Sequence, residues 1–579
     1  MATPATPVIA RTAGPLGGLR FEGSGPPGAA DTLVAEHLRM LGARCDGGPG
    51  GRFTVTGGGL GDVTATTSWG GAATDEATVQ AATGVMAVHG RRTGAPRGLA
   101  VDYTSTAAGV LAVQGLLAGL LARARGTGDV AEVGVSAERA GLLAVSQYLA
   151  AAGAEEGEAV EPAPGGPPFT SADGVVFELE TLDPGAWAAF WRALGAPEDA
   201  VRRGWRPFQF RYATACAPLP DGLHATVRSS PWSHVRDAAE VSGAEVCPLR
   251  SLAERAAEHD GAPPWELRSF EASYTASGVT GALPLCGFTV LEAGRRIQAP
   301  LAAHLLGLLG AEVIRIEPPG GDPLRGMPPA CSGVSARWLA LNRGKKAVEV
   351  DLKAPSGRER LRAMAADADV FLHNWAPGKA AEFGLDHEHL AAAGPSLVFA
   401  HTSGWADRLA DAPMGTDFMV QARTGVGEAV RPCDEPPAPS LMTLLDVLGG
   451  LLGAEAITAA LLLRERTGHG VRVDSSLLGA ADVLTAPARA RAARGLDPRR
   501  PAGFRRPLRT ADGWIALPDR PAAGHDVSGL ASEQALALLR ERGLDPVPVV
   551  TDLADLLARD VTGRDPHGAP AVPTPWSFA

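Results

Sequence analysis

Cysteine is scarce in this chain of 579 residues. The six cysteines are scattered singly, with no Cys-x-x-Cys pair, so their spacing offers neither a disulfide framework nor a cysteine zinc site. A chain without such a framework fits best in a reducing compartment. Residues 1–5 also lack the basic region and apolar core that open a signal peptide. We therefore expect a cytoplasmic protein that holds no metal.

The chain also lacks a basic stripe of the kind that binds nucleic acid. Its formal net charge is −11, with arginines and acids interleaved along the whole length. No Gly-x-x-x-x-Gly-Lys-Ser/Thr loop occurs, and no Gly-x-Gly-x-x-Gly follows the strand that we expect at 287–291. Enzymes that use nicotinamide or nucleoside triphosphates are therefore disfavoured. A different small molecule is the expected partner.

One apolar run, residues 444–463, is long enough to cross a bilayer, since about 20 residues suffice. It contains Asp446 and Glu455, and each acid costs roughly 2.5–3.5 kcal/mol at the centre of a membrane helix. The chain as a whole is 45% hydrophobic, which is enough for several packed cores. We expect this run to be a buried helix of a globular protein, with no membrane involved.

A segment of the chain occurs twice. In its second copy, Leu-Asp-Val-Leu-Gly-Gly at 445–450 leads into the apolar run, which ends in Arg-Glu-Arg-Thr-Gly-His-Gly at 464–470. In the first copy, Thr-Ser-Thr-Ala-Ala-Gly at 104–109 leads into a similar run with a similar basic end. Aligned without a gap, the copies place Ser105 opposite Asp446. A hydroxyl in one copy and a carboxylate in the other suggests one working site and one site that has lost its chemistry.

The repeat extends along the chain and divides it into unequal halves. Residues 34–43 echo 301–311, and residues 170–175 echo 509–514. We divide the chain into a truncated and diverged half at 1–255, whose smaller domain covers about 169–255, a linker at 256–283, and a complete half at 284–579.

Strands and helices alternate in the second half. Short apolar runs predict strands at 287–291, 312–316, 346–350, 370–374 and 397–401, with helices such as 300–309 and 357–366 between them. This alternation predicts an α/β fold with a mostly parallel, doubly wound, Rossmann-like sheet and a smaller α+β domain, duplicated in one chain as a pseudo-dimer. Ligands bind beyond the carboxyl ends of such strands, where Asn374, Trp375 and Ser403 would lie.

Asp446 is the first candidate for chemistry. It directly precedes the expected helix, where backbone N–H groups and the helix dipole favour an ionised carboxylate. A helix cap is the structural alternative. Gly449 and Gly450 follow, however, and would let a ligand or another backbone approach closely. Serine also caps helices, so the exchange with Ser105 keeps the structural role and removes the chemical one.

Basic residues gather near the same strand ends, among them Arg296, Arg315 and Arg325. Charged residues of this kind often form only a solvated face. As a group they would suit a ligand that carries several phosphates.

With these motifs in place, residues 284–579 resemble the family III coenzyme A (CoA) transferases, the group of formyl-CoA and carnitine-CoA transferases. The matching segments are Leu-Gly-Ala-Glu-Val-Ile-Arg-Ile-Glu at 309–317, Gly-Asp-Pro-Leu-Arg at 321–325, Asn-Arg-Gly-Lys-Lys at 342–346, Asp-Leu-Lys at 351–353, Ala-Asp-Val at 368–370, Asn374, Pro-Gly at 377–378, Gly-Leu at 384–385, Asp446 with the 464–470 segment, and Thr-Ala-Asp-Gly at 510–513. The first half resembles a truncated and degenerate member of the same family.

The resemblance implies a CoA-transferase in which Asp446 attacks an acyl-CoA thioester. A mixed anhydride with the enzyme would form, then an aspartyl-CoA thioester, and the acceptor carboxylic acid would take the CoA through a second anhydride. Backbone donors at Gly449 and Gly450 would stabilise the oxyanion. CoA, a substrate and not a permanently bound cofactor, would lie along Arg296, Ile297, Gln298, Ala299, Arg315, Arg325, Asn374 and Trp375.

Two alternatives stay open. Related α-methylacyl-CoA racemases pair the aspartate with a histidine in a Gly-His-Asp segment, which reads Gly415–Thr416–Asp417 here, and threonine cannot act as the second base. A binding protein without catalysis is the other alternative. The resemblance also implies an interlocked dimer, whose two halves one fused chain would supply, with a further homodimer as the open alternative. The sequence names neither the donor nor the acceptor.

Overall fold

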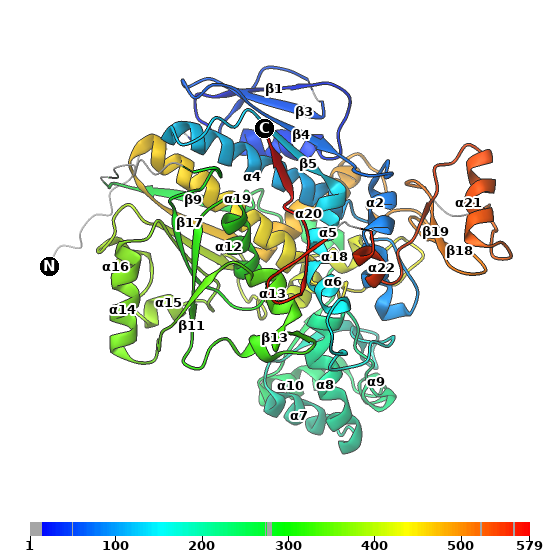
Figure 1. Ribbon diagram of the computed structural model, residues 1–579. Helices are drawn as coiled ribbons and strands as arrows, with labels where there is room; N and C mark the ends of the chain where they lie inside the picture. Colours follow the sequence, from blue (N-terminus) through cyan, green and yellow to red (C-terminus); the bar gives the residue numbers. More distant parts are fainter. Residues whose placement is uncertain (1–13, 49, 273, 275–280, 521–523, 560–561) are drawn as a thin grey trace.

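A seven-stranded sheet lies at the centre of the second half of the chain (Figure 1). The computed structural model describes residues 14–48, 50–272, 274, 281–520, 524–559 and 562–579. Across the sheet the strands are β14 (Lys346–Glu349), β11 (Glu312–Glu317), β10 (Thr289–Ala293), β15 (Val370–His373), β16 (Val398–Ser403), β17 (Gly470–Ser476) and β9 (Trp265–Phe270). Neighbours from β14 to β17 run parallel, and β9 is antiparallel to β17. The predicted α/β architecture is confirmed for this half.

Helices cover both faces of this sheet. Phe371 of β15 points into a core layer with α14 (Pro355–Ala366) and α16 (His387–Ala391). Its neighbour Leu372 points into the layer that holds α12 (Gln298–Leu308) and α19 (Leu444–Thr467). Successive side chains of a strand face opposite sides, so apolar residues at both positions bury both faces. The strands and helices lie within about two residues of their predicted positions.

The first half contains a mixed sheet of six strands. Its order is β2 (Arg44–Cys45), β1 (Arg20–Ser24), β3 (Arg52–Thr56), β4 (Val63–Ser68), β5 (Glu132–Ser136) and β23 (Trp576–Phe578). Strands β1, β3 and β4 are joined antiparallel, so the expectation of a mostly parallel sheet is wrong for this half. The glycine-rich turn between β3 and β4 is too short for the crossover helix that parallel neighbours need.

The two halves exchange their last strands. Strand β9 precedes the second half along the chain, yet it pairs with β17 in the sheet of that half. Strand β23 ends the chain and pairs with β5 in the sheet of the first half. The range 256–283, predicted as the linker, therefore contains a strand of the central sheet. Residues 273 and 275–280 of that range lie outside the described residues.

Two lobes project from the central body (Figure 1). One consists of β6 (Phe169–Thr170), β7 (Val176–Glu180), β8 (Glu245–Pro248), α7 (Pro184–Ala193), α8 (Glu198–Thr214), α9 (Asp221–Arg228) and α10 (Trp232–Ser242). The other consists of β18 (Leu508–Arg509), β19 (Trp514–Ala516), β20 (Val547–Pro548) and α21 (Ser532–Glu541). Each lobe is a small antiparallel sheet with helices, which is the expected α+β arrangement.

The remaining helices and strands connect these parts. They are α1 (Asp31–Met40), α2 (Glu76–Ala82), α3 (Val85–Gly90), η1 (Arg91–Thr93), α5 (Ala137–Ala144), α6 (Ser146–Ala152), α11 (Leu252–Glu258), η2 (Pro323–Gly326), β12 (Ala330–Cys331), β13 (Val334–Ser335), α13 (Ala336–Asn342), α15 (Lys379–Glu382), α17 (Asp417–Arg423), α18 (Val426–Ala429), α20 (Leu477–Ala493), α22 (Ala554–Leu557), β21 (Gly563–Arg564) and β22 (Pro570–Ala571).

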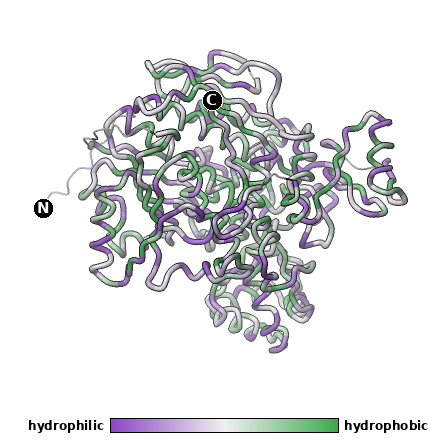
Figure 2. The backbone as a smooth tube through the Cα atoms, in the orientation of Figure 1, coloured by the Kyte–Doolittle hydropathy of each residue, from purple (hydrophilic) through white to green (hydrophobic). Residues whose placement is uncertain are grey.

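Two long helices, α4 (Tyr103–Arg125) and α19, form the interface between the halves. Both are apolar enough to cross a membrane, but their apolar windows are 100% and 94% buried inside the protein. Gln114 on α4 donates a hydrogen bond to the Leu451 carbonyl on α19 over 2.7 Å. Both helices are thus core helices, as predicted for residues 444–463. Figure 2 shows the hydrophilic stretches mostly along the outside of the molecule.

Candidate active site

Asp446 lies in the first turn of α19, three residues after the N-cap position at Thr443. The expectation that it directly precedes the helix is therefore wrong by one turn, because Leu444 and Leu445 already adopt helical geometry and are buried. Burial raises the pKa of Asp446 to about 6, while the Arg296 charge acts to lower it and the Glu180 charge to raise it. At pH 7 the Asp446 side chain is therefore still ionised in most molecules.

The side chain of Asp417 holds this first turn of α19 in place. The amide of Asp446 donates to Asp417 Oδ2 over 2.7 Å, and Gln421 Nε2 donates to Asp417 Oδ1 over 2.5 Å. Gln421 is held in turn by the amide of Ser440, which donates to its side-chain oxygen over 2.8 Å. Asp417 is fully buried, and burial together with the Asp446 carboxyl group raises its pKa well above the usual value. Of the two carboxyl groups, Asp446 therefore ionises more easily.

The first half repeats this arrangement with other side chains. Glu76 accepts hydrogen bonds from the amide and the hydroxyl of Ser105, each over 2.8 Å, and from Gln80 Nε2 over 2.9 Å. The amide of Leu99 donates to Gln80 over 2.8 Å. Glu76, Gln80, Leu99 and Ser105 thus correspond to Asp417, Gln421, Ser440 and Asp446 at one constant spacing along the chain. The geometry agrees with the sequence register that placed Ser105 opposite Asp446.

The loops after three parallel strands meet beside α19. Asn374, after β15, exchanges two hydrogen bonds with the backbone of Arg295, after β10, over 2.8 and 2.9 Å. Gln298, in the first turn of α12, donates to the carbonyl of Ser403 at the end of β16 over 3.4 Å. Trp375 is buried against His373, with 4.8 Å between the ring centres. The candidate residues 296–299, Asn374 and Trp375 therefore lie at one edge of the sheet, where parallel strands bring their carboxyl ends together.

Helices α12 and α19 touch closely at the two predicted glycines. A Cβ atom on Gly449 would lie 2.9 Å from Gln298 Nε2, and one on Gly450 would lie 2.9 Å from the Gln298 carbonyl oxygen. Both glycines lie in the second turn of α19 and permit this contact. Their proposed part in binding an oxyanion stays a prediction.

Two of the three basic residues that we predicted to bind CoA form ion pairs with acidic side chains of this chain. Arg315 is buried and paired with Glu292 and with Asp322. Arg325 pairs with Glu317 over 2.7 Å and stacks on a tryptophan. Arg296, by contrast, is exposed on the loop between β10 and α12. Their roles in CoA binding stay predictions.

The lobe of the first half adds residues that the sequence reasoning missed. Thr416 donates to Glu180 Oε2 over 2.9 Å, and Arg211 pairs with Glu180 Oε1 over 2.9 Å. The Tyr212 hydroxyl donates to the same carboxylate, and its ring stacks on Phe418 with 4.4 Å between centres. Glu180 ends β7, so a strand of one half reaches the candidate site of the other. No motif marks a lone glutamate in a diverged half.

In the first half, Arg505 from the second half contacts the segment before α4. This buried side chain donates to the carbonyl oxygens of Leu99 and Val101 over 3.0 and 2.8 Å. It also pairs with Asp102 over 2.6 Å and with Asp519 over 2.6 Å. An internal guanidinium thus ties the segment before α4 to the second half.

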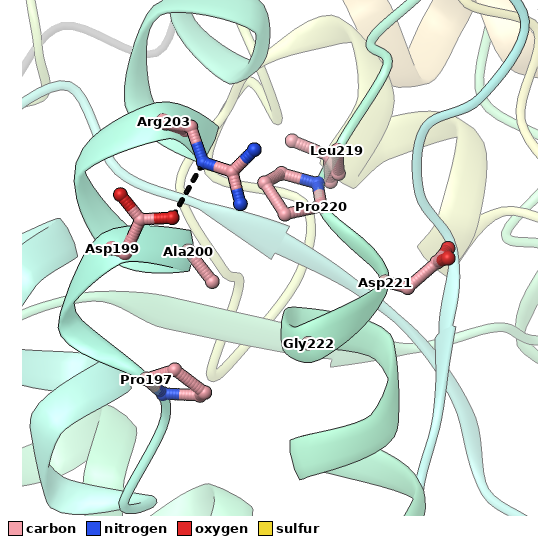
Figure 3. A pocket seen from close by; sticks show the side chains of 8 residues that line it. All are labelled: Pro197, Asp199, Ala200, Arg203, Leu219, Pro220, Asp221 and Gly222. Carbon is pink, nitrogen blue, oxygen red and sulfur yellow. Dashed lines mark ion pairs between the residues drawn. The ribbon is translucent and has the colours of Figure 1, made fainter.

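A surface hollow of about 510 Å³ lies elsewhere, on the lobe of the first half (Figure 3). Its walls come from the start of α8 and from the segment before α9, and they include the ion pair Asp199–Arg203 at 2.8 Å. The side chains of this pair are mostly exposed, so the hollow resembles an ordinary surface depression. Within the described residues no group of three or more His, Cys, Asp or Glu side chains is placed to hold a metal.

Comparison with known proteins gives a consistent result. Succinyl-CoA:glutarate CoA-transferase of Mus musculus is 36% identical over 201 residues, which are 34% of this chain and 45% of the mouse protein. The beta subunit of succinyl-CoA–L-malate CoA-transferase of Chloroflexus aurantiacus is 35% identical over 205 residues, 34% of this chain and 50% of that subunit. The chain thus spans about half the length of the curated relatives it matches.

A crystal structure of a CAIB/BAIF family protein from Brucella suis shares 28% identity and a TM-score of 0.46, over 51% of this chain and 93% of that one. The model of the family described as CoA-transferase family III matches residues 59–263 and 285–523, one region in each half. The predicted tandem arrangement agrees with these two regions. This chain belongs to CoA-transferase family III.

Proposed function

We propose that the protein transfers CoA from an acyl-CoA thioester to an acceptor carboxylic acid, with Asp446 as the nucleophile. The observation that carries this proposal is the position of Asp446: the Asp417 carboxylate fixes its backbone, and burial raises its pKa to about 6. A carboxylate with this pKa is mostly ionised at neutral pH and is less well solvated than a surface aspartate. The protein has one such site per chain.

The reaction proceeds through four displacements. The Asp446 carboxylate attacks the thioester carbonyl and expels the CoA thiolate, which gives a mixed anhydride between Asp446 and the acyl group. The thiolate then attacks the aspartyl carbonyl, which releases the first acid and leaves an aspartyl-CoA thioester. The acceptor carboxylate attacks this thioester, expels the thiolate again and forms a second anhydride. Attack of the thiolate on the acceptor acyl group gives the new thioester and regenerates Asp446.

CoA binds along the edge formed by the loops after β10 and β15. The backbone at 296–299 and the loop at Asn374 and Trp375 approach α19 from that side, which supports this placement. Arg315 and Arg325 support this site indirectly, because their pairs with acids hold the neighbouring turn in place. Gly449 and Gly450 let α12 pack closely against the α19 turns that carry Asp446.

A racemase is the second candidate. Such an enzyme needs one more acid or base near Asp446. Thr416 cannot supply it, but its partner Glu180 carries a carboxylate in the same place. Exchange of the α-proton of a 2-methylacyl-CoA with deuterium from the solvent tests this candidate. A CoA-transferase needs no such exchange, so its presence without transfer would favour the racemase.

The deciding experiment is intact-protein mass spectrometry after incubation with acyl-CoAs and hydroxylamine. Hydroxylamine converts an aspartyl anhydride or thioester into a stable hydroxamate. We expect a hydroxamate on Asp446 in the wild type and none in Asp446→Ala. Absence of the adduct with every donor, together with CoA binding that survives the substitution, would point to the non-catalytic alternative.

The setting of the reaction follows from the same features. The curated relatives are named for succinyl-CoA with glutarate or malate, so dicarboxylic acids are the first donors and acceptors to test. The cysteines of the described residues are unpaired, which supports a cytoplasmic enzyme. The exchanged strands β9 and β23 support an intramolecular pseudo-dimer as the functional unit.

A further inference from the structure

Arg296 differs from three other cations near the strand ends. Arg315, Arg325 and Lys345 each form an ion pair with an acid of this chain. Arg296 is exposed, and within the described part of the protein it has no carboxylate within ion-pairing distance. A guanidinium placed next to the proposed nucleophile is thus left available for an anion from outside.

The backbone of Arg296 is also unusual. Its φ is +65°, in the left-handed region that non-glycine residues rarely adopt. Such a conformation costs of order 1–3 kcal/mol and persists where the surroundings fix it. Here Arg295 is tied to Asn374 on one side and Ile297 opens α12 on the other. The loop therefore fixes the backbone from which the Arg296 side chain extends, at an energetic cost.

The Arg296 guanidinium lies near the residues around Asp446. The Arg296 guanidinium carbon lies 5.5 Å from the centre of the Tyr212 ring, and the Tyr212 hydroxyl donates to Glu180. Two residues further on, Gln298 contacts the α19 turn at Gly449. Glu180 is already paired with Arg211, so it does not consume the Arg296 charge. The positive charge of Arg296 also acts to lower the pKa of Asp446.

We propose that Arg296 binds a carboxylate at the far end of the acyl group, so that the substrates are CoA monothioesters of dicarboxylic acids. This inference rests on the proposed CoA transfer and names its substrate class. A guanidinium binds a carboxylate through two parallel N–H···O bonds, and the Tyr212 ring supports its flat face. A phosphate of CoA itself offers similar chemistry, so the experiment separates these two sources.

The test compares paired donors of equal chain length, succinyl-CoA against butyryl-CoA and glutaryl-CoA against valeryl-CoA. In Arg296→Gln, we expect kcat/KM for the two dicarboxylic donors to fall about 10- to 100-fold, as for loss of a hydrogen-bonded charge. Measured well above the pKa of Asp446, the values for butyryl-CoA and valeryl-CoA should fall by a smaller factor, so the preference for each dicarboxylic donor over its paired donor is the readout. Arg296→Lys should restore part of the loss, since lysine offers charge without the two-pronged geometry.

Arg202→Gln is the matched control, because Arg202 is an exposed arginine on the same helix as Tyr212 and pairs only across the surface. It should leave all four donors unchanged. An equal loss for all donors in Arg296→Gln, with weaker binding of free CoA by calorimetry, would assign the arginine to a phosphate and overturn the proposal. An unchanged preference would overturn it as well. Failure of CoA transfer itself is separate, since the wild type would then form no hydroxamate on Asp446 with any donor.

Discussion

The backbone amide of Asp446 donates a hydrogen bond to the side chain of Asp417 over 2.7 Å, so one aspartate holds the turn that presents the other. In the first half, Glu76 holds Ser105 through the same amide contact. The supporting carboxylate is thus present in both halves, whereas the presented group is a carboxylate in only one. Support without a nucleophile is what a site that has lost its chemistry would keep.

Replacing the presented group should therefore have opposite effects in the two halves. Asp446→Asn keeps the shape and the amide contact but removes the nucleophile, and we expect loss of detectable turnover and of the hydroxamate adduct. Ser105→Ala should leave kcat within a factor of about 2, because its hydroxyl only adds to the amide bond with Glu76. Loss of turnover in both variants would contradict a single active site.

The rate should follow the ionisation of Asp446. Its pKa is about 6, so adduct formation at limiting acyl-CoA should rise about tenfold per pH unit well below pH 6 and level off above it. Arg296→Gln removes a charge that lowers this pKa, so the rise should move to higher pH. Glu180→Gln removes a charge that raises it, so the rise should move to lower pH. Shifts of both variants in one direction would refute this electrostatic account.

The sequence predicted the central sheet and singled out Asp446 as the candidate nucleophile, because both inferences depend on local patterns. Apolar runs of strand length marked β10, β15 and β16, and parallel strands necessarily bring their following loops together. Asp446 was marked by the repeat, whose register the contacts of Gln80 and Gln421 reproduce.

Other parts of the site depend on contacts that no local pattern carries. Glu180 and Thr416 meet over 2.9 Å although they belong to different halves. The exchange of β9 and β23 depends in the same way on how the halves pack. The exact place of Asp446 was missed because the leucines before it carry no capping signal and simply join the helix. The short turn between β3 and β4 also makes these strands antiparallel, because it leaves no room for a crossover helix.

Close packing between α12 and α19 makes a prediction about stability. In Gly450→Ala the new Cβ atom would lie 2.9 Å from a backbone oxygen, which cannot rotate away, so we expect a net loss of about 1–3 kcal/mol. Gly453→Ala, one turn further along the same helix, meets its nearest neighbour at 3.5 Å and should gain up to about 1 kcal/mol from helix propensity. Urea unfolding of both variants measures the difference. Equal behaviour would mean that α12 moves aside at little cost.

Arg505 makes the last prediction, because its buried guanidinium joins the second half to the carbonyl groups and Asp102 of the first. Arg505→Ala leaves Asp102 and Asp519 without this partner; both are partly exposed and can regain water, so the loss should be about 3 kcal/mol, at the low end for a broken buried pair. Arg506→Ala removes an exposed pair with Asp434 and should cost at most about 1 kcal/mol. The two substitutions lie at neighbouring positions and remove the same atoms. Calorimetric unfolding therefore isolates the effect of burial on stability. The Asp446 adduct should form in both variants at a temperature where both are folded, because Arg505 contacts the segment before α4 and not the turn that carries Asp446. Loss of the adduct in folded Arg505→Ala alone would show that the first half controls catalysis beyond its role as a support.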